Sequence, residues 1–98
     1  MTVNKTIEQG TLCVFPIGRL DTMTAPELEK ELEASLDGVD ALVLDLKGVE
    51  YVSSAGLRVI LKAQKLMNAK GGMKVTGANA MIMEVFEITG FIDILTIE

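Results

Sequence analysis

The sequence predicts an α/β fold in which helices pack on a single mixed β-sheet. Strand-like apolar runs alternate with amphipathic helical stretches, as in strand–helix–strand units. The first two strand-like runs are separated only by Gln9 and Gly10, so we expect an antiparallel hairpin there. Later strands should pair in parallel through right-handed crossovers, in the element order ββαβαβαβ. A chain of 98 residues is long enough for one domain, spanning 1–98, and too short for two.

Five runs are expected to be the strands of this sheet. The second contains Pro16, which has no amide hydrogen for a ladder hydrogen bond and so marks the end of the strand or an edge of the sheet. The third run, ALVLDL, is apolar nearly throughout, as expected of a central parallel strand covered on both faces. The expected strands are residues 2–8, 11–17, 41–46, 73–77 and 91–97.

Three helices are expected between the strands. The first begins at 24–27, where Thr-Ala-Pro-Glu fits a capping box, and ends at Asp37-Gly38 after leucines repeating every four residues. The second runs from about Ser54 to Ala69. The third has Asn79 as its N-cap and closes at Gly90. Its inward-facing residues are expected to be Met81, Ile82, Val85 and Phe86.

Composition excludes several classes of function. The net charge of −5 and the absence of tryptophan argue against nucleic-acid binding. The sequence has no histidine, which removes Ser-His-Asp and Cys-His catalytic sites and His-ligated zinc. Cys13 is the only cysteine and is expected to be a small core residue rather than a metal ligand. No signal peptide or membrane-spanning run is recognised, so we expect a cytoplasmic protein without membrane insertion, cofactor or bound metal.

Two adjacent serines, Ser53 and Ser54, stand where the third strand-like region gives way to the second helix. One serine is explained by helix chemistry, because its oxygen can accept a hydrogen bond from a free amide at the helix start. The second hydroxyl is open to other readings. It could be a phosphorylation site, since a helix N-terminus favours an anion. It could also be a nucleophile, although the sequence offers no histidine as its general base.

Two stretches resemble the STAS domain, the fold of bacterial anti-sigma-factor antagonists. They are GRLDTMTAPEL at residues 18–28 and YVSSAGLRVIL at residues 51–61. The resemblance extends over essentially the whole chain, including the order of strands and the third helix with its closing glycine.

The resemblance implies a function in partner switching. In such antagonists an anti-sigma factor, which is also a serine kinase, phosphorylates a serine, and a PP2C-type phosphatase removes the phosphate. The unphosphorylated antagonist binds the kinase and frees the sigma factor, whereas the phosphorylated form lets go. Matching the family motif places the acceptor at Ser54, with Asp21 beside it. The other expected neighbours of the phosphorylation site are Thr22, Ser53, Gly56 and Arg58.

The sequence departs from the family pattern directly before the acceptor. Ser53 stands where the family commonly has an aspartate, so a capping group is kept but its charge is lost. Ser53 is therefore an alternative acceptor. Asp21 becomes the main local acid, with the alternative that it only braces a turn by accepting hydrogen bonds from the backbone near it.

Basic residues line one face of the second helix. Arg58 lies four residues after Ser54, and Lys62 and Lys65 continue the same face. This stripe could meet an acidic patch on a kinase, or Arg58 could help to hold the phosphate. It could equally be an ordinary solvated helix face. Met83 on the third helix is expected to be exposed and is a further candidate contact.

The sequence therefore predicts a non-enzymatic binding module whose partner is an anti-sigma factor and serine kinase. One alternative keeps the fold without the switch: a STAS subunit that docks constitutively in a transport or signalling complex. Another is a hydrolase that uses Ser54.

Overall fold

The computed structural model describes residues 1–98 and confirms the predicted fold class, an α/β fold with one six-stranded sheet. Three α-helices and a short 3-10 helix, η1, accompany the strands. No helix combines the length and the apolar character needed to cross a membrane. In chain order, the elements are β1 (Thr2–Glu8), β2 (Thr11–Leu20), α1 (Ala25–Ser35), β3 (Ala41–Asp45), β4 (Val49–Val52), α2 (Ser54–Asn68), β5 (Met73–Thr76), α3 (Ala80–Thr89), η1 (Phe91–Asp93) and β6 (Thr96–Ile97).

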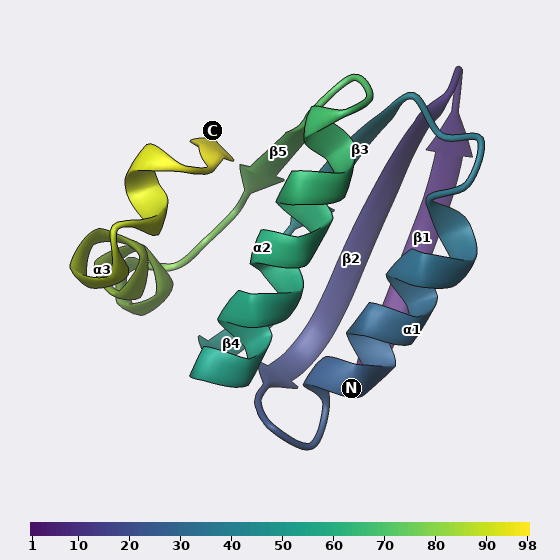
Figure 1. Cartoon of the computed structure of the whole chain (residues 1–98). Coiled ribbons are helices and arrows are strands. Elements are labelled where there is room, and N and C mark those ends of the chain that lie inside the picture. The colour runs from purple at the N-terminus through teal and green to yellow at the C-terminus, as the bar shows by residue number, and fades with distance from the viewer.

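The sheet has the order β1-β2-β3-β5-β6, and β4 pairs separately with β2. As predicted, β1 and β2 form an antiparallel hairpin. All other strand pairs are parallel. Figure 1 shows α1 and α2 side by side across the same face of the sheet. This topology brings the ends of β2 and β4 together at the start of α2.

The strand β2 changes partner along its length. Residues 11–14 pair with β3 and residues 18–20 pair with β4. Pro16 lies between these two stretches, opposite Val3 of β1. Of the two alternatives expected for Pro16, the end of the strand is wrong, because β2 continues to Leu20, whereas the edge alternative fits, because no parallel strand pairs with β2 at this residue. A residue without an amide hydrogen is accommodated where β2 has neither parallel partner.

The strand β4 was not predicted from the sequence. Its four residues include buried Val49 and Val52 and exposed Glu50. So short a run gives little periodic signal, and its pairing with β2 depends on residues about thirty positions earlier in the chain.

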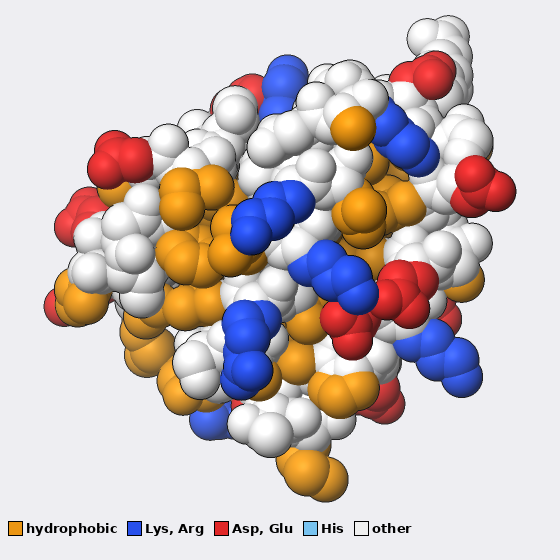
Figure 2. All heavy atoms as spheres, viewed as in Figure 1, with side chains coloured by type: hydrophobic (Ala, Val, Ile, Leu, Met, Phe, Trp, Pro, Cys, Tyr) orange, Lys and Arg blue, Asp and Glu red, His pale blue; other side chains and the backbone are white.

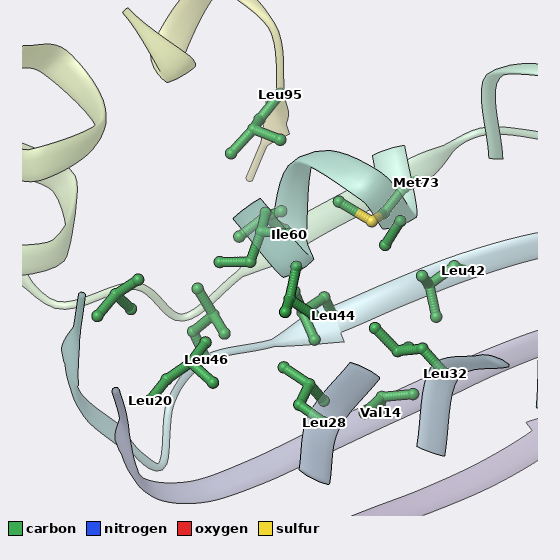
Figure 3. Packing of buried hydrophobic residues seen from close by; sticks show 14 of the residues in the cluster. Val14, Leu20, Leu28, Leu32, Leu42, Leu44, Leu46, Ile60, Met73 and Leu95 are labelled. Carbon is green, nitrogen blue, oxygen red and sulfur yellow. The ribbon is translucent and has the colours of Figure 1, made fainter. Parts of the chain in front are cut away.

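One cluster of 23 buried hydrophobic residues forms the core. Figure 3 shows Leu28 and Leu32 of α1, Ile60 of α2, and Leu42 and Leu44 of β3 converging on it. Alternate residues of β3 lie on the opposite face of the sheet and are only partly buried. The expectation that this strand is covered on both faces is therefore wrong.

Cys13 lies on the same open face of the sheet. It pairs with Val43 of β3 and is half-buried, outside the core cluster, whereas its neighbours Leu12 and Val14 point into the core. The expected core position of Cys13 is therefore wrong. When all residues of a strand are apolar, the sequence does not show which of its two alternating sets of side chains faces the helices.

The helix α3 is rotated relative to the prediction. Ile82 and Phe86 are fully buried as expected, but Met81 is 55% exposed. Met83, expected to be exposed, is half-buried against the core. The cap residue Asn79 accepts a hydrogen bond from Ile82 N at 2.8 Å, and its side-chain amide donates to carbonyls of β4. These tertiary contacts help to fix the rotation of α3.

The last predicted strand, 91–97, is mostly another structure. Residues 91–93 form η1, and only Thr96 and Ile97 pair with β5. Gly90 ends α3 in the left-handed conformation, with φ of 80°. Phe91 then stacks on Phe86 with 6.5 Å between ring centroids, which draws residue 91 towards the core instead of into the sheet.

Candidate functional site

The turn after β2 and the first turn of α2 are neighbours at one end of the molecule. Leu20 at the end of β2 pairs with Val52 at the end of β4. Ser53 N donates a hydrogen bond to Leu20 O at 2.8 Å. The two motifs recognised in the sequence therefore meet, and Figure 1 shows the loop between β2 and α1 beside the start of α2.

Ser53 is the N-cap of α2. Its backbone is extended, and its Oγ accepts a hydrogen bond from Gly56 N at 3.3 Å. Its backbone carbonyl accepts from Leu57 N at 2.9 Å. The side chain is half-buried and engaged in the helix start, which is the capping role expected of one of the two serines.

Ser54 is the first residue of α2 and is exposed. Its hydroxyl makes no hydrogen bond within the protein. Because Ser53 satisfies the amides of Gly56 and Leu57, the amides of Ser54 and Ala55 are the ones left without an intrahelical acceptor. The free hydroxyl thus stands at the positive end of the helix dipole, where an anion is stabilised.

Gly56 allows α2 to approach β2 closely. A Cβ atom at this position would lie 2.7 Å from Leu20 Cγ and 3.0 Å from Leu20 O. The expected neighbour of the phosphorylation site is thus a packing residue that seats the start of α2 against the end of β2.

Asp21 braces the turn that follows β2. Its Oδ1 accepts hydrogen bonds from Met23 N at 3.0 Å and Thr24 N at 3.1 Å. The hydrogen bond from Thr24 N is the largest cause of a lowered pKa of the Asp21 carboxyl; the Met23 amide, the Thr24 hydroxyl and Arg19 act in the same direction, and desolvation opposes them. Asp21 makes no hydrogen bond to either serine, so the turn-bracing alternative describes its contacts.

Thr24 does not form the predicted capping box. Its Oγ1 donates to Arg19 O at 2.6 Å and accepts from Asp21 N at 2.9 Å. No side chain caps α1. Local spacing suggested a cap, but the threonine hydroxyl instead closes the turn. The adjacent Thr22 is exposed and makes no side-chain hydrogen bond.

The predicted basic stripe on α2 is exposed, but its three residues differ in whether they pair with an acidic side chain. Lys62 donates to Glu33 Oε1 at 2.8 Å and Glu29 Oε2 at 3.2 Å, both on α1. These two hydrogen bonds, that from Glu33 first, raise the pKa of Lys62. Arg58 and Lys65 have no acidic partner and are free to meet one. They flank Leu61 in a shallow hollow on this face, along which Figure 2 shows blue side chains beside orange ones.

Two features of this end of the molecule were not found from the sequence. Met23, at the tip of the braced turn, is 83% exposed. The guanidinium of Arg19 lies over the ring of Tyr51, 4.5 Å from its centroid. No sequence signal marks either feature, because a methionine between polar residues has no periodic partner and the Arg19–Tyr51 contact depends on the β2–β4 pairing.

The sheet, the braced turn and the serine-capped α2 together form the arrangement of a STAS domain. The sequence model of the STAS domain family matches residues 2–98 of this chain. The chain belongs to the STAS domain family. It is 40% identical over 90 residues to BtrV of Bordetella bronchiseptica, assigned as an anti-sigma factor antagonist, covering 90% of this chain and 78% of that protein.

Two solved structures are also similar. An anti-sigma factor antagonist from Mycobacterium paratuberculosis is 27% identical with a TM-score of 0.89, over 98% of this chain and 83% of that one. The Bacillus cell fate determinant SpoIIAA in its phosphorylated form is 13% identical with a TM-score of 0.76, over 99% of this chain and 91% of that one, and shares the fold.

Proposed function

We propose that this protein is an anti-sigma factor antagonist that binds an anti-sigma factor, itself a serine kinase, and releases it when Ser54 is phosphorylated. The observation that carries the proposal is the contrast between the two serines. Ser53 Oγ is engaged as the helix cap, whereas the Ser54 hydroxyl is exposed and unbonded. Relatives named as anti-sigma factor antagonists support the same function.

Phosphorylation would act through charge rather than refolding. A phosphate adds about −1.5 to −2 charges at neutral pH. At Ser54 the free amides of the first helical turn and the helix dipole would favour that charge, and Arg58 lies one turn further along. The first turn of α2 is already formed, so its free amides need no rearrangement to face an anion. SpoIIAA supports this expectation, since the phosphorylated form of that protein has the same fold.

The partner surface would consist of the first turn of α2 and its exposed basic side. Arg58 and Lys65 are free to pair with acidic groups of the kinase, whereas Lys62 is already paired with α1. Met83 is half-buried and drops out of the proposed surface. A charged group at an interface contributes by pairing with an opposite charge on the partner. Because Lys62 is already paired within the protein, we expect Arg58 and Lys65 to contribute more to the affinity for the kinase than Lys62 does.

The contacts of Ser53 disfavour it as the alternative site of phosphorylation. Ser53 is the poorer acceptor, because its Oγ is half-buried and already accepts a hydrogen bond from Gly56 N, so it is less accessible to a kinase than the exposed Ser54 hydroxyl. The protein would act by binding and not as an enzyme, with a PP2C-type phosphatase resetting the switch in the cytoplasm.

Phosphate mapping tests the acceptor. The protein is incubated with its anti-sigma factor kinase and ATP, and the product is analysed by intact mass and peptide sequencing. We expect one phosphate, on Ser54, and none on the Ser54→Ala variant. No phosphate from a kinase active on a control substrate would contradict the switch and favour constitutive docking, and phosphate only on Ser53 would contradict the assignment.

Binding measurements test the surface. Ser54→Ala should keep the affinity for the kinase, whereas Ser54→Asp should weaken it. Arg58→Ala should weaken binding more than Lys62→Ala does. Lys30→Ala on α1, an exposed lysine without an ion pair, is the matched control and should bind like the wild type. Equal affinities for Arg58→Ala and Lys30→Ala would contradict the proposed surface.

A further inference from the structure

Met23 is the most exposed large hydrophobic side chain of the protein, at 83%. Single exposed apolar side chains are common on protein surfaces, so exposure alone assigns no role. Two further features distinguish Met23: hydrogen bonds fix the turn that carries it, and this turn lies against the start of α2.

The turn that carries Met23 is fixed by hydrogen bonds. The amide of Met23 itself donates to Asp21 Oδ1, and Thr24 Oγ1 joins the turn to Arg19 O. The first bond uses the backbone of Met23 and the second closes the turn around it, so the side chain of Met23 stays free. A side chain presented on a fixed backbone costs less conformational entropy to bind than one on a mobile loop.

This turn lies against the start of α2. Ser53 N donates to Leu20 O, one residue before Asp21, and Gly56 packs directly on Leu20. Met23 and Ser54 are therefore carried by adjoining segments at the same end of the molecule, as Figure 1 shows for the β2–α1 loop and the start of α2. Figure 2 shows hydrophobic side chains protruding at that end.

We propose that Met23 is an anchor for the partner: it inserts into an apolar pocket of the anti-sigma factor kinase next to the position that receives Ser54. The inference rests on the proposed function and adds the chemistry of the partner surface, an apolar pocket bordered by acidic groups that face Arg58. Methionine suits such a role because its unbranched side chain adapts to a pocket.

The anchor also explains how one phosphate could release the partner. Burial of Met23 excludes water from the space around Ser54 in the complex. A phosphate added there would lose its hydration and lie against the apolar pocket and the acidic groups of the partner, which is costlier than the same charge at a wet interface. Met23 thus provides binding energy in the unphosphorylated complex and makes that complex sensitive to charge.

The test measures the dissociation constant for the kinase that phosphorylates Ser54, using the full chain. Met23→Gln keeps the length of the side chain and the backbone hydrogen bonds but makes the side chain polar. We expect it to raise the dissociation constant at least about tenfold, as removal of an interface anchor does. Met23→Leu, which stays apolar, should remain within about threefold. Met81→Gln changes an exposed methionine on α3 and serves as the control, with unchanged binding.

The outcomes separate this inference from the proposed function. If Met23→Gln binds like the wild type, or if Met81→Gln loses as much affinity, the anchor is overturned. When Ser54→Asp still weakens binding in that case, the proposed function survives without the anchor. If Ser54→Asp and phosphorylation both leave binding unchanged, the proposed function fails as well. Thermal melting of each variant confirms that the fold is retained.

Discussion

Ser53 and Ser54 are chemically identical neighbours with different surroundings. Ser53 is half-buried and its Oγ caps Gly56, whereas Ser54 is exposed and its hydroxyl is free. The sequence predicted that one serine would cap the helix, and the family resemblance placed the acceptor at Ser54 with Ser53 as the alternative. The extended backbone of Ser53 decides which serine caps, because only a residue just outside the helix can direct its oxygen at the third helical amide.

Substitution of each serine should therefore affect stability differently. Ser53→Ala should lower the free energy of unfolding by about 1 kcal/mol, because it removes the cap. Ser54→Ala should change it by less than about 0.5 kcal/mol, as is usual for an exposed residue. Urea unfolding followed by circular dichroism measures both. Equal losses in the two variants would contradict the division of roles.

Asp21 gives the turn a dependence on pH. Its pKa in the folded protein is lowered below the ordinary value of 3.8, so the ionised carboxylate stabilises the fold at pH values above 3.8. That contribution is lost as the pH falls below 3.8 and through the lowered pKa. Asp21→Asn should therefore be less stable than the wild type at neutral pH, and the difference should shrink below pH 3.8. A difference that stays constant down to acidic pH, measured by thermal melting, would contradict this role.

At the level of elements, local signals predicted the hairpin, α2 with its serine cap and α3 with its Asn79 cap. They did not predict β4, the rotation that exposes Met81, or the replacement of most of the last strand by η1. In each of these cases contacts between segments distant in sequence decide the structure. Likewise, the turn at Asp21 and the cap at Ser53 were within reach of the sequence, but their adjacency depends on the pairing of β4 with β2.

The close seating of α2 on β2 predicts an inverted effect of alanine. Glycine to alanine inside a helix normally stabilises by up to about 1 kcal/mol. At Gly56 the new Cβ would meet Leu20 at 2.7 Å, so Gly56→Ala should instead destabilise the protein, by about 1–3 kcal/mol. Denaturant unfolding measures the sign. Stabilisation by Gly56→Ala would show that the start of α2 can move away from β2 without cost.

The molecule as a whole has one core cluster and an exposed serine outside it. A phosphate on Ser54 would lie outside that core, so the change that a partner senses should be confined to the surface. The protein already carries a net charge of −5. The added phosphate therefore affects binding through its position beside Arg58 and Met23 and not through the change in net charge.

The most direct test is a calorimetric titration of the anti-sigma factor kinase with the unphosphorylated protein and with the protein fully phosphorylated on Ser54. A charge that is desolvated at an interface and placed against like charges of the partner costs about 2 kcal/mol or more, so we predict that phosphorylation weakens binding at least about thirtyfold. Equal affinities of the two forms would contradict the account.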